Sequence, residues 1–294
     1  MLATRFSNSF CVPAILPSSV GGLLVKIHPA SPLDRPMELL SETSIGRDES
    51  SSLTLGQDSI SRRHAIIEHR NGEFLLRDLG STNGTFVNEV RVSTSVSLSP
   101  GDRIRFGDQI FKFLTTDGIE SQYHEVIFKM MTTDGLTQVY NKRFFLDSLD
   151  REILQSQRGK QSICVMMLDL DKFKSVNDTY GHLAGDAVLT EFAKRASSML
   201  RGGELFARYG GEEFSILCAP ATLEQAKLAA ERVMAITASA PVITESAEIP
   251  MTVSIGMACY SGEGELDAND LLGQADVQLY RAKQNGRNQV QYAT

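Results

Sequence analysis

The stretch RYGGEEFSIL, Arg208 to Leu217, determines how we interpret the C-terminal half of the chain. Its ends have the composition of a β-hairpin, whereas the two glycines and two glutamates in its middle weaken any strand. Glycine permits a tight turn and leaves room for a ligand beside the backbone. We therefore predict a hairpin whose tip, Gly210 and Gly211, lies at a functional site.

The segments on either side of the hairpin predict a domain that mixes helices and strands. An apolar strand and a helix precede it, and a helix and a strand follow it, which gives the β-α-β-β-α-β order of the ferredoxin-like arrangement. A further helix and a short strand end the chain. These segments are, in order, ICVMMLDLD, GDAVLTEFAKRASSML, TLEQAKLAAERVMAITAS, MTVSIGMACY, DANDLLGQADVQLYRAKQNG and QVQYA.

Carboxylates gather where the first strand and the hairpin tip are expected to meet. Asp169 and Asp171 end the strand, and alternation places them on the same side of it or nearly so. Glu212 at the tip can approach them, and three or four carboxylates so clustered repel one another. Mg²⁺ relieves such repulsion and takes its other ligands from phosphate and water. The cluster predicts a metal and a phosphate, unless these are solvated charges on a turn.

Two cations near the C-terminus are candidates for holding that phosphate. Lys283 and Arg287, in the segment AKQNGRN, lie one helical turn apart and could bind phosphates from one side. The alternative is a basic helix end that complements the helix dipole. The chain has no GKxT-type phosphate loop.

Five ordered motifs give a resemblance that covers the chain from about Asp134 to the end. This part resembles the GGDEF domain of diguanylate cyclases, a family that condenses two GTP into cyclic di-GMP and two pyrophosphates. The signature here reads GGEEF, an accepted form, and the resemblance implies an α+β ferredoxin-like fold of the nucleotidyl cyclase palm type. The motifs are DGLTQVYNKRFF, DLDKFKSVNDTYGHLAGD, RYGGEEF, MTVSIGMA and ADVQLYRAKQNGRN.

The resemblance implies roles for residues in these motifs. Two Mg²⁺ ions, or Mn²⁺ in their place, would polarise the α-phosphate and help ionise the 3′-hydroxyl that attacks it. A carboxylate and an amide can match the guanine edge, whereas adenine lacks the donor pair that the carboxylate needs. The implied residues are Asp169, Leu170 through its carbonyl and Glu212 for metal, Asn177, Asp186, Phe173, Lys283 and Arg287 for substrate, and Glu213 and Lys174 for catalysis.

The product implies a second copy of the chain. One site holds one GTP, whereas cyclic di-GMP joins two nucleotides, so two domains must face each other as a homodimer. One helical stripe just before the domain could pair with a copy of itself. Its residues are Ile119, Tyr123, Val126 and Met130.

Product inhibition is left open by one departure from the family pattern. The family's inhibitory product site is an RxxD motif just upstream of the signature. Arg201-Gly202-Gly203-Glu204 stands at that place, with a longer glutamate as its last residue. Arg201 and Glu204 are therefore candidates for an inhibitory site.

The N-terminal half predicts a different architecture, an all-β sandwich over residues 21–116. Short β-like runs such as LLVKI, HAIIEH, EFLLRDL and IFKFL alternate with turn clusters such as RNGE, STNG and SPGD. We expect a flexible tail over residues 1–20, a helical linker over 117–133 and the cyclase domain over 134–294.

Loops of this half bring together cations, hydroxyls and an amide, a set that can surround a phosphate dianion. Turns also favour such residues without any function. Their order and spacing resemble the forkhead-associated (FHA) domain, a β-sandwich that binds phosphothreonine peptides. The resemblance implies that His64 supports the loops and that the phosphopeptide contacts are Arg47, Ser61, Arg62, Thr82 and Asn83.

The phosphothreonine could come from the chain itself. Thr4 is the only threonine before the sandwich, and the 17 residues from there to residue 21 could extend about 55 Å. A tethered ligand has an effective concentration on the order of mM. Phosphorylated Thr4 and a separate phosphoprotein both remain open as partners.

Composition narrows the remaining possibilities. The net charge of −7 argues against a protein that coats nucleic acid. No apolar run approaches the roughly 18 residues that span a bilayer, and the N-terminus lacks a signal-peptide pattern. The four cysteines show no metal-ligand spacing, so we expect free thiols in a reducing cytoplasm. The alternative function is a non-catalytic adaptor that binds GTP or cyclic di-GMP and is recruited to phosphoproteins.

Overall fold

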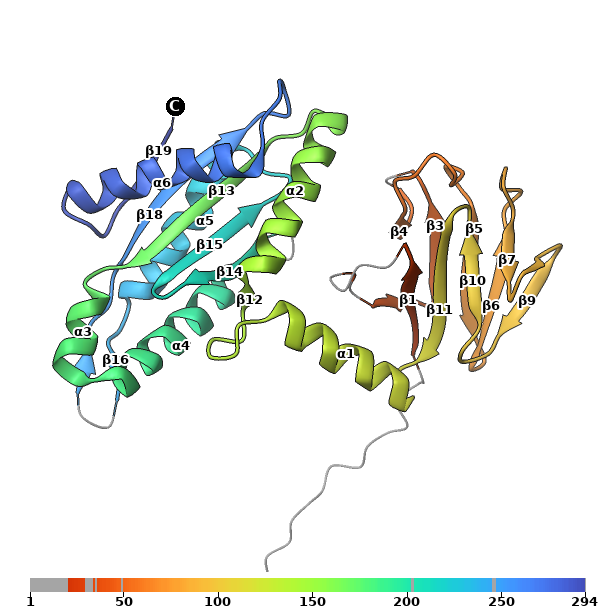
Figure 1. Cartoon of the computed structure of the whole chain (residues 1–294), viewed down its shortest axis with the longest axis horizontal. Coiled ribbons are helices and arrows are strands. Elements are labelled where there is room, and N and C mark those ends of the chain that lie inside the picture. The colour runs from red at the N-terminus through yellow and green to blue at the C-terminus, as the bar shows by residue number, and fades with distance from the viewer. Residues whose placement is uncertain are drawn as a thin grey trace, which may run out of the picture. The chain divides into compact units, whose positions relative to one another are not determined.

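The structure is a computed structural model that describes residues 21–29, 34, 36–48, 50–201, 204–244 and 247–293. It divides into two compact units, an N-terminal unit (Met1–Phe128) and a C-terminal unit (Lys129–Thr294). The division falls within helix α1 (Ile119–Thr132) (Figure 1).

The N-terminal unit is a sandwich of two sheets, as predicted. One sheet has the order β2-β1-β11-β10-β7-β8 and the other β4-β3-β5-β6-β9. Alternating residues point into a shared core, where the side chains of Leu24, Ile67, Leu76 and Phe111 are fully buried. The strands are β1 (Gly22–His28), β2 (Met37–Leu39), β3 (Glu42–Gly46), β4 (Leu53–Thr54), β5 (Ala65–Arg70), β6 (Glu73–Asp78), β7 (Thr85–Val87), β8 (Val90–Arg91), β9 (Ser95–Leu98), β10 (Arg103–Phe106) and β11 (Gln109–Thr115).

The C-terminal unit is built on one sheet of order β12-β14-β15-β13-β18-β19. Its four central strands, with the helices between them, have the predicted ferredoxin-like order. Every residue of β13 is buried, as expected for a central strand covered on both faces. The strands are β12 (Tyr140–Asn141), β13 (Ile163–Leu170), β14 (Glu204–Gly210), β15 (Glu213–Cys218), β18 (Val253–Tyr260) and β19 (Val290–Tyr292), and a separate small sheet pairs β16 (Val242–Ile243) with β17 (Glu248–Ile249).

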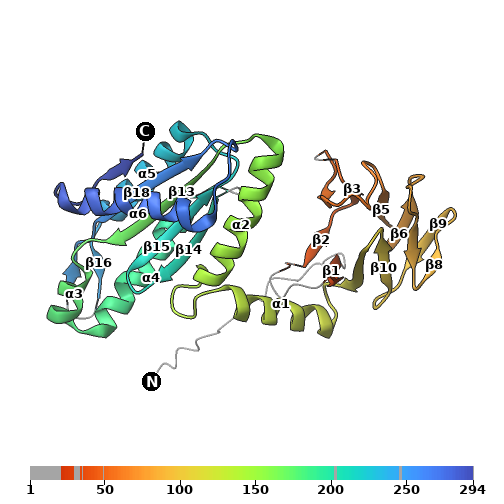
Figure 2. The ribbon, with the colours of Figure 1, turned by 45° about the horizontal axis from the view of Figure 1, so that its top comes forward.

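Helices cover both faces of this sheet (Figure 2). Helices α2 (Lys142–Gly159) and α6 (Ala268–Gln284) pack on one face, and α4 (His182–Met199) and α5 (Leu223–Ala238) pack on the other. Phe192 of α4 lies edge-on to Phe206 and Phe214, with ring centroids 6.1 and 4.8 Å apart. Truncating such a buried aromatic to alanine costs about 3–5 kcal/mol.

Several elements were not predicted from the sequence. Helix α2 fills the residues between the DGLTQVYNKRFF motif and β13, and Asn141 caps its start by accepting a hydrogen bond from the Phe144 N–H. Helix α3 (Phe173–Tyr180) is only eight residues long and largely polar. The chain turns from α3 into α4 at Gly181, which adopts a φ of 84°.

The prediction that all cysteines are free thiols is wrong. Cys164 of β13 lies directly opposite Cys259 of β18, and the two form a disulfide with 4.1 Å between their Cα atoms. The partners are 95 residues apart, so no local spacing could reveal the pair. Cys218 is free and buried, and burial raises its pKa to about 12. Cys11 lies outside the described residues.

Helix α1 carries the predicted apolar stripe on an exposed face. Its four residues, Ile119, Tyr123, Val126 and Met130, are between 48% and 87% exposed. The end of the helix is tied to the C-terminal unit, because the Asn141 side-chain amide donates to the Met131 carbonyl. None of the helices in the described part of the chain has the length and apolar character needed to cross a bilayer.

Candidate functional site

A buried carboxylate and a lysine meet at the end of β13. Asp169 is 7% exposed and lies opposite Glu213 of β15 and Ser254 of β18. The Lys283 ammonium of α6 is 2.8 Å from the Asp169 Oδ2 atom. Burial raises the pKa of Asp169, and the Lys283 ammonium offsets this only in part. The position therefore favours a cation beside the carboxylate.

Glu212 completes this group from the tip of the hairpin. The Leu170 N–H donates to the Glu212 carbonyl, which holds the tip against the end of β13. Burial raises the pKa of Glu212, and the negative charges of Asp169 and Glu213 raise it further. The two predicted metal-binding carboxylates are thus close enough to repel each other.

The donor set fits a hard divalent cation. Two carboxylates and a backbone carbonyl supply only oxygen atoms, which Mg²⁺ prefers, and the Lys283 ammonium already stands in as a cation beside Asp169. Within the described ranges, no group of three or more His, Cys, Asp and Glu side chains is placed to hold a metal ion. A metal here would therefore take its other ligands from backbone, substrate and water.

Asp171 does not join the cluster, contrary to expectation. Its carboxylate accepts hydrogen bonds from the Thr252 and Ser254 hydroxyls, at 2.7 and 2.6 Å, and from the Asn288 N–H at 3.0 Å. Ser254 lies directly opposite Asp169 on β18, so the Asp171 carboxylate that it contacts lies on the same side as Asp169, as alternation predicted. Three donors therefore occupy its oxygens, so the carboxylate is held by its own hydrogen bonds.

The hairpin tip is held in shape by Arg208. Its Nε and Nη2 atoms donate to the Gly211 carbonyl at 2.9 and 2.8 Å, and its Nη1 atom lies 3.1 Å from Asp134, just after α1. Gly211 has a φ of 54°, and no atom lies within 4 Å of where a Cβ would stand on Gly210 or Gly211. The space beside both glycines is therefore open, as predicted for a ligand.

Asn177 and Asp186, the predicted guanine contacts, are brought together by a glycine. A Cβ on Gly185 would lie 2.0 Å from the Asn177 Oδ1 atom, so only glycine lets this amide rest against α4. Asp186 is the next residue of α4 and is exposed. The Asn177 amide therefore rests on α4 at the position just before Asp186.

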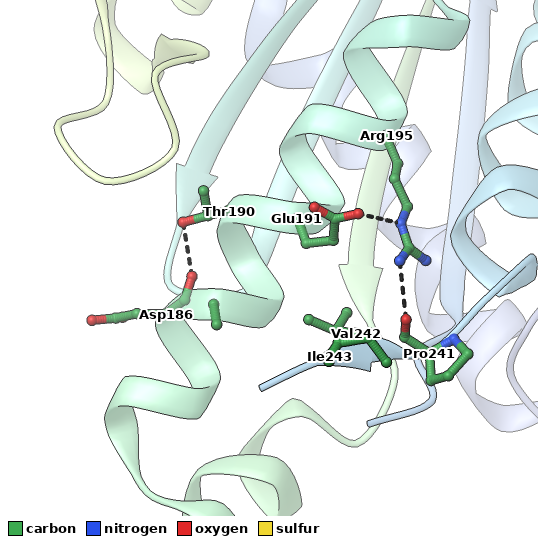
Figure 3. A pocket seen from close by; sticks show the side chains of 8 residues that line it. Asp186, Thr190, Glu191, Arg195, Pro241, Val242 and Ile243 are labelled. Carbon is green, nitrogen blue, oxygen red and sulfur yellow. Dashed lines mark hydrogen bonds and ion pairs between the residues drawn. The ribbon is translucent and has the colours of Figure 1, made fainter. Parts of the chain in front are cut away.

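A pocket of about 510 Å³ begins at Asp186 and runs between α4 and β16. Its cation, Arg195, pairs with Glu191 at 2.8 Å and donates to the Pro241 carbonyl, so it is already neutralised. Figure 3 shows the Asp186 side chain pointing away from Arg195 and Pro241. The lining residues are Asp186, Ala187, Thr190, Glu191, Arg195, Pro241, Val242 and Ile243.

The other predicted site residues lie around the same end of the sheet. Phe173 is buried in the core and can offer a ligand only its backbone, whereas Lys174 beside it on α3 is exposed. Glu213 is half-buried and lies opposite both Asp169 and Gly210. Arg287 is exposed in the loop after α6.

The candidate inhibitory site contains an arginine that the sequence analysis missed. Glu204 accepts from the Arg201 N–H at 2.7 Å and pairs with Arg232 of α5 at 3.3 Å. Arg232 is 28 residues away from Glu204, so no local motif connects the two. Residues 202 and 203 lie outside the described residues.

In the N-terminal unit, hydrogen bonds connect the predicted phosphopeptide contacts. The Thr82 N–H donates to the Ser61 hydroxyl at 2.9 Å, and the Arg47 N–H donates to the Ser61 carbonyl at 3.0 Å. The Asn83 amide donates to the Ser59 carbonyl at 2.7 Å. Arg62 is exposed nearby in sequence. These loops therefore form one connected rim.

His64 is a buried support of that rim, as predicted. Its Nδ1 atom accepts from the Ser61 N–H at 3.1 Å, and its Nε2 atom lies 3.3 Å from the Gly84 carbonyl. Burial lowers its pKa, which favours the neutral ring. The sequence analysis missed Asp58, whose carboxylate pairs with the Arg47 guanidinium.

Comparisons with known proteins match both halves of the chain. The family model described as "Diguanylate cyclase, GGDEF domain" matches residues 131–289, and the FHA domain model matches residues 43–107. Diguanylate cyclase A of Treponema denticola is 40% identical over 138 residues, which are 47% of this chain and 37% of that protein. Response regulator PleD of Caulobacter vibrioides is 38% identical over 152 residues, 51% of this chain and 33% of that protein. The chain thus spans about a third of the length of these relatives.

Two solved structures resemble the C-terminal part of the chain. The coiled coil and GGDEF domain of DgcB from Caulobacter crescentus, in complex with c-di-GMP, has a TM-score of 0.55 and 31% identity, covering 59% of this chain and 92% of that one. Diguanylate cyclase SiaD from Pseudomonas aeruginosa, in complex with its activator SiaC, has a TM-score of 0.53 and 34% identity, covering 60% of this chain and 69% of that one.

Proposed function

Because the chain belongs to the GGDEF family and carries an FHA domain, we propose that it is a diguanylate cyclase that condenses two GTP into cyclic di-GMP and two pyrophosphates. The observation that carries the proposal is the meeting of Asp169, Glu212 and Lys283 at the open glycine turn. This group combines oxygen donors for a metal with a cation for phosphate.

The metal site would consist of Asp169, Glu212 and the Leu170 carbonyl, with Mg²⁺ as the ion or Mn²⁺ in its place. When bound, two such ions polarise the α-phosphate and favour ionisation of the attacking 3′-hydroxyl. With a cation bound at Asp169, the Lys283 ammonium that now pairs with this carboxylate would be free to bind phosphate. Glu213, opposite Asp169 on the neighbouring strand β15, would support this group or accept a proton.

Substrate recognition would come from the helices around the turn. The Asp186 carboxylate can accept from the N1–H and N2 amine of guanine, and the Asn177 amide can complete that edge. Lys174 and Arg287 are exposed cations that can bind phosphates, and Phe173 can contribute its N–H at the start of α3. The substrate GTP is available in the cytoplasm, where we expect the protein to act.

Two copies of the chain are needed, because each site holds one of the two nucleotides that are joined. The exposed stripe of α1 is a suitable contact between them. Its spacing of four, three and four residues is that of a short coiled-coil seam. Product could inhibit by binding at Arg201 and Glu204, beside Arg232.

The FHA domain would regulate this activity by binding phosphothreonine at Arg47, Ser61, Arg62, Thr82 and Asn83. The Arg47 guanidinium, which pairs with Asp58 in this structure, can instead pair with a phosphate dianion. The partner would be a separate phosphoprotein or phosphorylated Thr4, which lies outside the described residues.

The test is to incubate the purified chain with GTP and Mg²⁺ and to measure cyclic di-GMP by mass spectrometry. Glu212→Gln should abolish turnover with the fold retained, because the amide is a poor metal ligand of the same volume. Glu231→Gln, at an exposed position of α5, is the matched control and should be fully active. GTP binding without any product in wild-type protein, including dimerised and phosphorylated samples, would instead favour the non-catalytic adaptor.

A further inference from the structure

The loop that carries Arg287 has a backbone that needs external support. Three consecutive residues after α6, Gly286, Arg287 and Asn288, adopt positive φ angles of 111°, 66° and 44°. This left-handed region suits glycine and is tolerated by asparagine, but it is unfavourable for arginine. Such a conformation persists only where surrounding contacts enforce it.

Asp171, the residue directly after β13, supplies one of those contacts. Its Oδ2 atom accepts from the Asn288 N–H at 3.0 Å and from the Thr252 hydroxyl at 2.7 Å. Its Oδ1 atom accepts from Ser254, a fully buried hydroxyl, at 2.6 Å. The Asp171 N–H also donates to the Thr252 carbonyl, so both its backbone and its side chain are fixed.

Other hydrogen bonds define where the loop places Arg287. The Arg287 N–H donates to the Ala282 carbonyl at 3.0 Å, and the Gln289 side chain donates to the carbonyls of Ala282 and Arg287. These bonds fix the Arg287 backbone against the last turn of α6, the turn that also carries Lys283. The loop therefore places Arg287 beside the helix end from which Lys283 reaches Asp169.

We infer that Asp171 is a positioning residue that holds the loop 286–288 in its left-handed form and thereby presents Arg287 to the terminal phosphates of GTP. This rests on the proposed function, in which Arg287 binds phosphate. Asp171 acts through the Asn288 N–H and has no part in binding metal, because its two oxygens already accept three hydrogen bonds. Asp169 and Asp171 are thus close in sequence but have different roles, one at the metal site and one in supporting the loop.

The test compares two nucleotides by calorimetry with the full chain and Mg²⁺. 3′-Deoxy-GTP lacks the attacking hydroxyl and remains intact, and GMP lacks the terminal phosphates. Arg287→Ala should weaken the binding of 3′-deoxy-GTP about tenfold or more, because a charge-assisted hydrogen bond is lost. Asp171→Asn should weaken the binding of 3′-deoxy-GTP by a similar factor and leave GMP affinity unchanged. The double variant should bind 3′-deoxy-GTP no more weakly than Arg287→Ala alone.

The outcomes separate the inference from the proposed function. If Arg287→Ala leaves 3′-deoxy-GTP affinity unchanged, the phosphate role of Arg287 in the proposed function is wrong. If Arg287→Ala weakens binding but Asp171→Asn does not, or the two losses multiply, the positioning role is overturned. Loss of GMP binding by folded Asp171→Asn would likewise overturn it, because the effect would then be general.

Two further variants complete the experiment. Asp150→Asn removes the same charge at an exposed position of α2 and should bind both nucleotides as wild type does. If Asp171→Asn fails to fold, Thr252→Val decides the matter, since it removes one donor to the Asp171 Oδ2 atom. It should weaken the binding of 3′-deoxy-GTP by about threefold, in line with the loss of one hydrogen bond that acts only through Asp171, and leave GMP binding unchanged. Wild-type affinity for 3′-deoxy-GTP would overturn the inference.

Discussion

Gly185→Ala should separate the stability of α4 from recognition of guanine. The added Cβ would lie 2.0 Å from the Asn177 Oδ1 atom and 3.2 Å from the Phe173 ring. Since real Cβ contacts are at least 3.0 Å, the Asn177 amide must move by about 1 Å or more. A misplacement of that size can lower activity by about 10²-fold.

The same change should leave the fold almost as stable as before. The atom that must move is the end of a flexible side chain, and alanine within a helix is favoured over glycine by about 0.5–1 kcal/mol. We therefore expect kcat/KM for GTP to fall about 10²-fold with little change in Tm, and no additional loss when Asn177→Ala is added.

Gly273→Ala is the matched control, because it also lies in a helix, α6, but has no atom within 4 Å of the added Cβ. It should keep full activity. Wild-type kcat/KM in Gly185→Ala, together with a loss in Asn177→Ala, would refute the steric reasoning. A large fall in Tm for Gly185→Ala would do the same.

Three further predictions follow from the charges. Glu212→Gln should raise the Tm of metal-free protein, because the raised pKa of Glu212 means that its charge opposes folding near neutral pH. Mg²⁺ with GTP should then stabilise the variant less than wild type. An unchanged Tm of the metal-free variant would contradict this reasoning. Burial opposes ionisation of Asp78, but hydrogen bonds from Ser81 and Thr85 lower its pKa overall. The N-terminal unit should therefore lose stability as the pH falls below about 4. Asp78→Asn should flatten this pH dependence in acid-unfolding curves. Arg47→Ala should weaken the binding of a phosphothreonine peptide about tenfold or more, as measured by fluorescence anisotropy. It should not change the turnover of GTP measured without peptide. Wild-type peptide affinity in this variant would exclude Arg47 from the pocket.

Regular patterns were predictable from the sequence. The β-sandwich followed from short apolar runs between turn clusters, and the ferredoxin-like order followed from the alternation of longer segments. The meeting of Asp169 with the hairpin tip was also predictable, because the buried strand and the glycine turn each have a strong local signal. Helix α3 was missed because it is short and polar.

Long-range pairs were not predictable. The Arg208–Asp134 pair joins residues 74 apart, and the Asn288–Asp171 hydrogen bond joins residues 117 apart. Each depends on how separate elements pack, which leaves no trace in local spacing. Alternation gave the side to which Asp171 points, but not the donors from Thr252, Ser254 and Asn288 that occupy its carboxylate.

The most direct test of the account is the stoichiometry of the reaction catalysed by the purified chain. With GTP and Mg²⁺, we predict one cyclic di-GMP and two pyrophosphates for every two GTP consumed, with no product from ATP and none from Asp169→Asn. Folded wild-type dimer that consumes no GTP, or product formation that persists in Asp169→Asn, would contradict the central claim that the Asp169 and Glu212 site performs this condensation.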